Sequence, residues 1–174
     1  MANVNPKIMN ALDRWAGGIV SLDENKNHCL GFITSAIENG AGISIAEFYS
    51  TYVKWHADPV EHWTEDEPWA RDAEHSLRKL GMGISIHDVE PGDLLFIWRD
   101  AEAKEWSKRE GHTVYYGHVG ILIAPGLLIE NVDPAYRPHS FHRGNIQITS
   151  LHRWFTPSTV IRFDPDKKVP PGGS

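Results

Sequence analysis

The stretch GHVGILIAPGLLIENV, residues 117–132, decides the fold of this chain. Two apolar runs, 118–123 and 127–132, lie on either side of the turn sequence APG. Short runs of Val, Ile and Leu bounded by Pro and Gly are typical of strands that a tight turn joins. The stretch therefore predicts a β-hairpin over residues 118–132 and, with it, an antiparallel arrangement.

Further strands are predicted on both sides of this hairpin. EPGDLLFIW, residues 90–98, indicates a turn followed by a short apolar strand. NIQITSL (145–151) and STVIRF (158–163) are two more candidate strands. The second half of the chain is therefore expected to form a small antiparallel sheet.

The first half of the chain has helical periodicity instead. Apolar residues recur at helical spacing over 5–16, 29–38 and 44–56, and WARDAEHSLRKLG (69–81) indicates a fourth helix. Ser44 and Glu47 form a capping-box pattern at the start of the third. Helices first and strands second predict the α+β class, with N-terminal helices packed on a small antiparallel sheet.

The composition fits one globular domain. The 174 residues are 41% hydrophobic and 23% charged, which is enough for a core. We expect a single domain over residues 1–163 and a linker-like, disordered tail over 164–174, to which a second module could be joined. The net charge of −6 argues against a nucleic acid partner. No apolar run reaches the roughly 18 residues of a membrane helix, so we expect no membrane insertion.

The single cysteine, Cys29, opens the second predicted helix. It can form neither an internal disulfide nor a CxxC metal pair. The positive end of a helix dipole stabilises a thiolate, so one interpretation of Cys29 is a nucleophile. The other is a small buried hydrophobic residue, because free cysteines commonly pack in cores.

Polar residues on the hairpin could complete a thiol site. His118 follows Gly117, whose small size would let a substrate approach, and Glu130 and Asn131 lie on the next strand. A Cys–His pair oriented by a third polar group is the arrangement that a cysteine hydrolase requires. Neighbours on a strand point to opposite faces, so only one of Glu130 and Asn131 can face His118. We favour Glu130, since a carboxylate stabilises an imidazolium; Asn131 would then hold the loop that follows.

Four segments together resemble a known family. NHCLGFITSAI (27–37), EPGDLLFIW, YGHVGILI (116–123) and LLIENV occur in the order found in the NlpC/P60 and CHAP group of cysteine peptidases and amidases. The resemblance extends over about residues 10–163. It implies a papain-like α+β fold in which Cys29 is the nucleophile and His118 the general base. Glu130 or Asn131 would orient the imidazole.

Two features depart from the family pattern. Leu30 stands where many NlpC/P60 members have a small residue, and it either narrows the substrate pocket or points into the core. The third catalytic residue is often His in that branch. Glu130 followed by Asn131 looks more like the CHAP branch and phage lysins.

The resemblance implies a peptidoglycan hydrolase, an amidase or endopeptidase that cleaves an amide of the peptide stem. The N-terminus has no long apolar run typical of a signal peptide. We therefore expect synthesis in the cytoplasm and delivery to the cell wall through a holin, a phage tail or a secretion system. The ENV sequence, the Arg-containing loop after it and NIQITSL favour a phage endolysin or tail-associated lysin, with a wall-binding module after the tail. A type VI secretion amidase effector and a degenerate domain that binds the wall without cutting are the alternatives.

Substrate contacts are expected around this site. The segment 55–69 is acidic and rich in Trp, and its tryptophans either stack on sugar rings or cover the helix layer. Arg137 lies on the predicted loop after ENV and could pair with stem-peptide carboxylates. The candidate substrate-binding residues are Asn27, Trp63, Trp69, Gly117 and Arg137.

No cofactor is expected, with calcium as the alternative. Asp23, Asn25 and Asn27 alternate as at the start of a calcium loop. However, His28 and Thr34 occupy the positions where an EF-hand has Gly and Glu, so a solvated loop is favoured. The HSFH sequence (139–142) lacks the converging ligands that zinc needs.

Overall fold

The computed structural model describes residues 3–25, 29–53, 70–98, 118–131, 142–143, 145–151 and 155–168. It contains helices and an antiparallel sheet, as the α+β prediction required. The helical segments are α1 (Asn5–Ala16), α2 (Cys29–Ala41), α3 (Ile45–Glu47), the π-helix η1 (Phe48–Val53), α4 (Ala70–Lys79) and the 3₁₀-helix η2 (Ile86–Asp88). The strands are β1 (Gly83–Ile84), β2 (Leu94–Trp98), β3 (His118–Ala124), β4 (Leu127–Asn131), β5 (His142–Arg143), β6 (Ile146–Ser150) and β7 (Phe155–Ile161).

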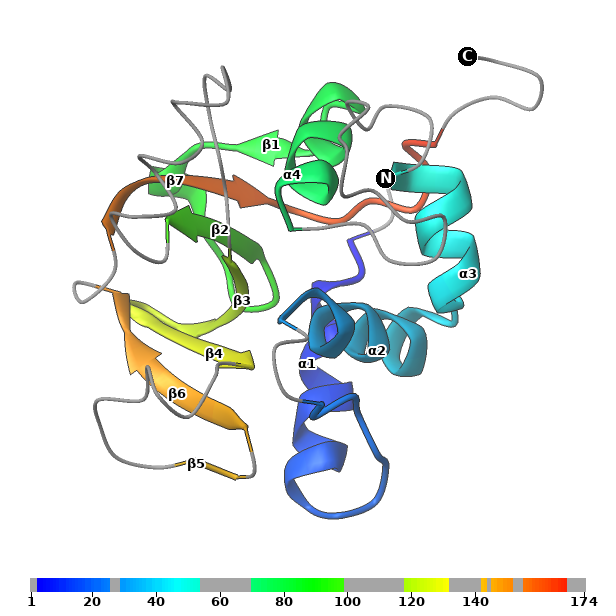
Figure 1. Cartoon of the computed structure of the whole chain (residues 1–174), viewed down its shortest axis with the longest axis vertical. Coiled ribbons are helices and arrows are strands. Elements are labelled where there is room, and N and C mark those ends of the chain that lie inside the picture. Colours follow the sequence, from blue (N-terminus) through cyan, green and yellow to red (C-terminus); the bar gives the residue numbers. More distant parts are fainter. Residues whose placement is uncertain are drawn as a thin grey trace.

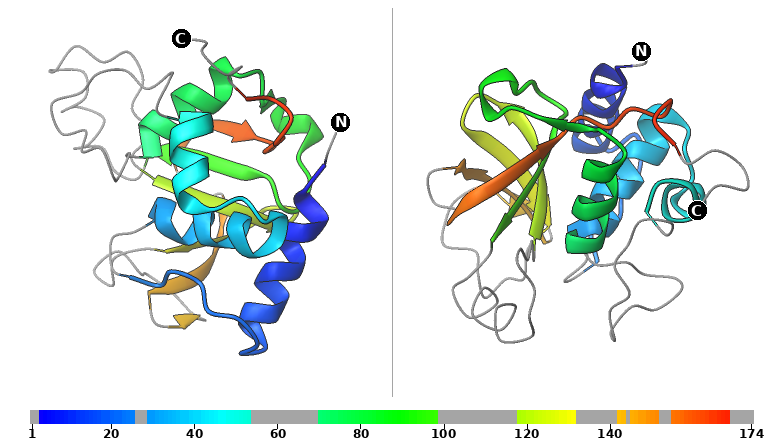
Figure 2. Two further views of the ribbon diagram at one scale, coloured as in Figure 1. Left: turned by 90° about the vertical axis from the view of Figure 1, so that its right-hand side faces the viewer. Right: turned by 90° about the horizontal axis from the view of Figure 1, so that it is seen from above.

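The strands of the described segments form one seven-stranded sheet in the order β1-β7-β2-β3-β4-β6-β5. All of their pairings are antiparallel. The predicted hairpin is the β3–β4 pair, and the remaining strands extend the sheet on both sides of it. The strands lie on one side of the molecule and α1, α2 and α3 on the other, as Figures 1 and 2 show.

The main core lies between the helices and one face of the sheet. Alternate strand residues point to opposite faces, so one set meets the helices and the other forms a smaller cluster. The helices contribute Ile8, Leu12, Ile33 and Ile37 to the main core, and the sheet contributes Phe96, Val119, Ile121 and Ile129. Leu95, Leu122 and Val160 form the smaller cluster.

Helices α1 and α2 touch through their backbones at Gly40. A Cβ atom at this position would lie 2.5 Å from the carbonyl oxygen of Lys7, closer than any real contact. The absence of a side chain at Gly40 therefore sets how closely α2 approaches α1.

The PGD turn before β2 is held by buried polar contacts. Asp93 is fully buried and accepts hydrogen bonds from Asn5 Nδ2 at 2.7 Å and from Arg162 Nε and Nη2 at 2.9 Å. Gly92 has a φ of 98°, and a Cβ there would lie 2.7 Å from the Asn5 Cβ. The turn thus connects α1, β2 and the segment after β7, which gives this motif a structural role.

Several element boundaries differ from the prediction. The helix expected over 29–38 continues to Ala41. The helix expected over 44–56 is α3 followed by the π-helix η1, and residues 54–56 lie outside the described segments. Ser44 caps α3 by accepting a hydrogen bond from the Glu47 N–H, as the capping-box pattern predicted. The strands β1 and β5 are not predicted from the sequence, because each has two residues, too few to show an alternating pattern.

The C-terminal segment packs on the domain beyond the predicted boundary at residue 163. Asp164 is buried, and the Tyr52 hydroxyl donates a hydrogen bond to the Pro165 carbonyl at 2.8 Å. Lys167 Nζ donates to the Gly81 carbonyl at 2.7 Å. Residues 164–168 therefore belong to the folded part, and residues 169–174 of the predicted tail lie outside the described segments.

Among the described helices, no single one is both long and apolar enough to cross a bilayer. The bent pair formed by α2 and residues Ile45–Val53 meets these two requirements together.

Candidate active site

Cys29 is the first residue of α2 and lies next to the start of β3. Its side chain is partly buried against the main core, and the following residue, Leu30, is buried within it. The sequence left open whether Leu30 narrows the substrate pocket or points into the core, and the structure places it in the core. The backbone N–H groups of Val119 and Leu30 stabilise the Cys29 thiolate and help to lower its pKa.

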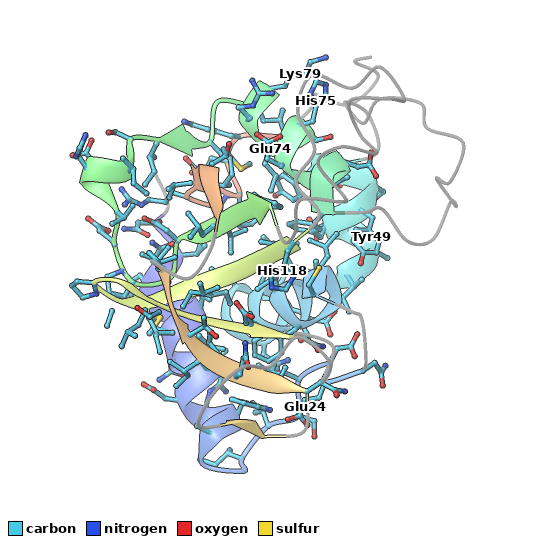
Figure 3. The ribbon with its side chains drawn as sticks, turned by 60° about the vertical axis from the view of Figure 1, so that its left-hand side comes forward. Glu24, Tyr49, Glu74, His75, Lys79 and His118 are labelled. Carbon is cyan, nitrogen blue, oxygen red and sulfur yellow. The ribbon has the colours of Figure 1, made fainter. Side chains whose placement is uncertain are left out.

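His118 is the first residue of β3, and its ring is fully buried. Its Nε2 atom lies 3.6 Å from Glu130 Oε2. The pKa shifts of His118 and Cys29 each arise in part from the other residue, so the imidazole lies close to the thiol. Figure 3 shows His118 beside helix α2. The imidazole thus lies between the thiol of α2 and the carboxylate of β4.

The pKa shifts of Cys29 and His118 both favour the charged forms, the thiolate and the imidazolium. Burial disfavours the thiolate, but the hydrogen bond and charge of His118, with the N–H groups of Val119 and Leu30, outweigh it and lower the pKa of Cys29. Burial likewise disfavours the imidazolium, but Cys29 and Glu130 outweigh it and raise the pKa of His118 to about 9. Between these two pKa values the site holds a thiolate and an imidazolium.

Glu130 has a separate partner for each carboxylate oxygen. It is fully buried on β4, where its register partner is Gln147 on β6. Gln147 Nε2 donates a hydrogen bond to Glu130 Oε1 at 2.9 Å, while Oε2 faces His118. Sequence reasoning missed Gln147, because the pairing of β4 with β6 depends on a connection whose length hides the register.

Asn131 points away from Glu130 and contacts the segment that leads into α2. Its Nδ2 atom donates to the carbonyl of Asn25 at 2.7 Å and lies 3.5 Å from that of Asp23. Asn145 Nδ2 donates to the neighbouring carbonyl of Glu24 at 2.7 Å. We expected Asn131 to hold the loop after β4; the contacts that the structure describes are with the segment ahead of Cys29.

The calcium candidates Asp23 and Asn25 are bonded to protein groups. Asp23 Oδ1 accepts the N–H of Asn25 at 2.9 Å, and the Asp23 N–H donates to Ser35 Oγ at 3.0 Å. Among the described residues, no three His, Cys, Asp or Glu side chains form a group that could hold a metal ion. The expectation of no cofactor, with calcium as the alternative, stays a prediction.

The predicted substrate-binding residues cannot be placed around this site. Residues 26–28, 54–69, 99–117 and 132–141 lie outside the described segments. These ranges include Asn27, Trp63, Trp69, Gly117 and Arg137. The site that the structure brings together consists of Cys29, His118 and Glu130, supported by Gln147 and Asn131.

The chain matches no family model and no curated protein.

Proposed function

We propose that this protein is a cysteine hydrolase that cleaves an amide bond in the peptide stem of bacterial peptidoglycan. The observation that carries the proposal is the contact of His118 with both Cys29 and Glu130. Three elements, α2, β3 and β4, supply one residue each, and the pKa values of the thiol and the imidazole favour the ion pair. That arrangement is the one a nucleophilic thiol needs.

The chemistry of the reaction follows from this ion pair. The Cys29 thiolate attacks the carbonyl carbon of the amide and forms a tetrahedral intermediate. The intermediate collapses to a thioester as the imidazolium of His118 gives its proton to the departing amine. Neutral His118 then takes a proton from a water molecule, which attacks the thioester. Release of the carboxylate product restores the thiolate and the imidazolium.

Glu130 acts on the imidazole and takes no proton in this scheme. Its carboxylate faces Nε2 of His118 and so holds the imidazole in place beside Cys29. Its negative charge also stabilises the imidazolium that donates the proton. Backbone N–H groups at the start of α2 would stabilise the oxyanion of the intermediate, since the helix N-terminus carries partial positive charge.

The substrate class rests on the sequence resemblance. The NHCLGF, PGDL, GHVGI and LLIENV segments support a member of the NlpC/P60 and CHAP group, and a phage endolysin or tail-associated lysin is the form that we favour. Such a protein acts at the cell wall after delivery through a holin or a tail. A type VI amidase effector of the same superfamily would use the same three residues.

Purified peptidoglycan sacculi test the proposal directly. Wild-type protein should release soluble peptides or new amino groups, and Cys29→Ala and Cys29→Ser should release none above background. His87→Ala changes an exposed histidine on η2 and serves as the control for His118→Ala. Equal release by wild type and Cys29→Ala would refute the hydrolase, and binding of both to sacculi without release would favour a wall-binding domain. Mass spectrometry of the products identifies the bond.

A further inference from the structure

Gln147 and Glu130 form a buried polar pair on the face of the sheet that carries His118. They are register partners across β4 and β6, and both are buried, with Gln147 1% exposed. The Gln147 amide donates to Glu130 Oε1 at 2.9 Å. A buried carboxylate oxygen without a donor is costly, so this hydrogen bond stabilises the Glu130 carboxylate in its observed position.

The hydrogen bond also fixes the direction of the carboxylate. With Oε1 engaged by Gln147, Oε2 is the oxygen that remains for His118, and it lies 3.6 Å from Nε2. Gln147 is itself fixed by the backbone pairing of β6 with β4. An amide is suited to this position, because it donates an N–H without adding a charge beside the carboxylate.

Among the described residues, two elements supply charges that raise the pKa of His118. Cys29 of α2 and Glu130 of β4 supply the charges that favour its protonated form. Gln147 of β6 is neutral and reaches the imidazole through Glu130. A substitution of Gln147 should therefore alter the protonation of His118 and, through it, that of Cys29.

We infer that Gln147 is a positioning residue of this site, whose amide keeps the Glu130 carboxylate aimed at His118. The inference rests on the role of Glu130 in the proposed function. Without the Gln147 donor, the Glu130 carboxylate can turn away from His118, and it then stabilises the imidazolium less. The Cys29 thiolate then loses part of its counter-charge, so the thiol deprotonates at a higher pH.

Alkylation of Cys29 by iodoacetamide measures this effect without any wall substrate. Cys29 is the single cysteine of the chain, so the rate against pH reports its thiolate fraction. In Gln147→Met and Gln147→Leu, the rise of the rate should move to higher pH. Below the pKa of Cys29, alkylation should slow by about threefold or more, as an upward shift of about half a unit implies.

Thr149→Val is the matched control. Thr149 lies on the same strand and the same face as Gln147 and is also buried, but its register partner is Leu128. Its alkylation profile should equal that of the wild type. A shift as large as that of Gln147→Met would show that any change in β6 disturbs the site, and the inference would be abandoned.

A double variant separates positioning from a structural role. Glu130→Gln already removes the charge through which Gln147 acts, so adding Gln147→Met should leave the alkylation profile of Glu130→Gln unchanged. A further shift, or a wild-type profile in both folded single Gln147 variants, overturns the inference. If neither Gln147 variant folds, the residue serves stability and the inference falls as well.

The outcomes also separate this inference from the proposed function. Shifted alkylation in Gln147 variants of a protein that leaves sacculi intact would keep the positioning role and remove the hydrolase. If the wild-type protein releases peptides from sacculi but its Gln147 variants keep the wild-type alkylation profile, the hydrolase stands and the positioning role falls.

Discussion

Glu130 and Asn131 are consecutive on β4, yet they support different partners of the site. Glu130 faces the imidazole of His118, and Asn131 donates to the carbonyl of Asn25 in the segment that leads to Cys29. Because neighbouring strand residues point to opposite faces, one strand positions both the base and the nucleophile. A shift of β4 along the sheet would therefore disturb both at once.

Loss of the Glu130 side chain should cost far more activity than loss of Asn131. Glu130→Ala leaves a buried imidazole without its carboxylate, and we expect release from sacculi to fall about a hundredfold or more. Asn131→Ala loosens the segment before Cys29 but leaves the ion pair, so a fall of about tenfold or less is expected. The rate of peptide release by the two variants, with the Tm of each as a folding control, decides the order. The reverse order would make Asn131 the catalytic partner.

The pH dependence of hydrolysis should be bell-shaped. As pH falls through the lowered pKa of Cys29, the thiolate is protonated and attack stops. As pH rises through about 9, the pKa of His118, the imidazolium loses the proton that the departing amine needs. Activity is therefore expected between these limits, and kcat/KM measured against pH tests it.

The Glu130→Gln variant serves as the comparison for this profile. Its alkaline limb should move to lower pH, because the charge that raises the pKa of His118 is gone. An alkaline limb that stays near pH 9 in Glu130→Gln would contradict the assigned role of the carboxylate.

Substitution of Gly40 should destabilise the fold even though alanine favours helices. The new Cβ would meet the Lys7 carbonyl oxygen at 2.5 Å, so α1 and α2 would have to move apart. We expect Gly40→Ala to lose about 1–3 kcal/mol in the free energy of unfolding, more than the roughly 1 kcal/mol that helix propensity returns. Gly17→Ala, whose Cβ would have no neighbour closer than 3.5 Å, is the control in urea denaturation. Equal stability of the two variants would argue against the close helix contact.

The segment 164–168 should contribute to stability. A chain that ends at residue 163 loses the Pro165 carbonyl that the Tyr52 hydroxyl contacts, while a chain that ends at 168 keeps it. The shorter chain should have a lower Tm, and Tyr52→Phe should cost about 1 kcal/mol in the chain ending at 168. In the shorter chain, Tyr52→Phe should have a smaller effect. Indistinguishable Tm values would return the domain boundary to residue 163.

Removal of calcium should leave the protein unchanged. The carbonyls of Glu24 and Asn25 already accept hydrogen bonds from Asn145 and Asn131, so they are engaged as acceptors within the protein. We expect the same activity and the same Tm with EGTA as with added calcium. A loss of both with EGTA that calcium restores would establish a site at this loop.

Local sequence determined the elements and part of the site. Periodicity gave the helices before the sheet, and the turn sequence APG gave the hairpin β3–β4. Alternation alone predicted that Glu130 and Asn131 would point to opposite faces, which their contacts show. These features depend on neighbours within a few residues, so the sequence encodes them directly.

Only the tertiary structure decided which distant residues meet. Gln147 became the partner of Glu130 through the register of β6 against β4, and Asp93 became the common acceptor for Asn5 and Arg162. Leu30 proved to be a core residue once α2 was packed on the sheet. Strand register and core packing depend on the burial of side chains throughout the domain, so a local sequence pattern does not determine them. For this reason the sequence identified Cys29 and His118 as candidates, but only the tertiary structure showed that they lie together.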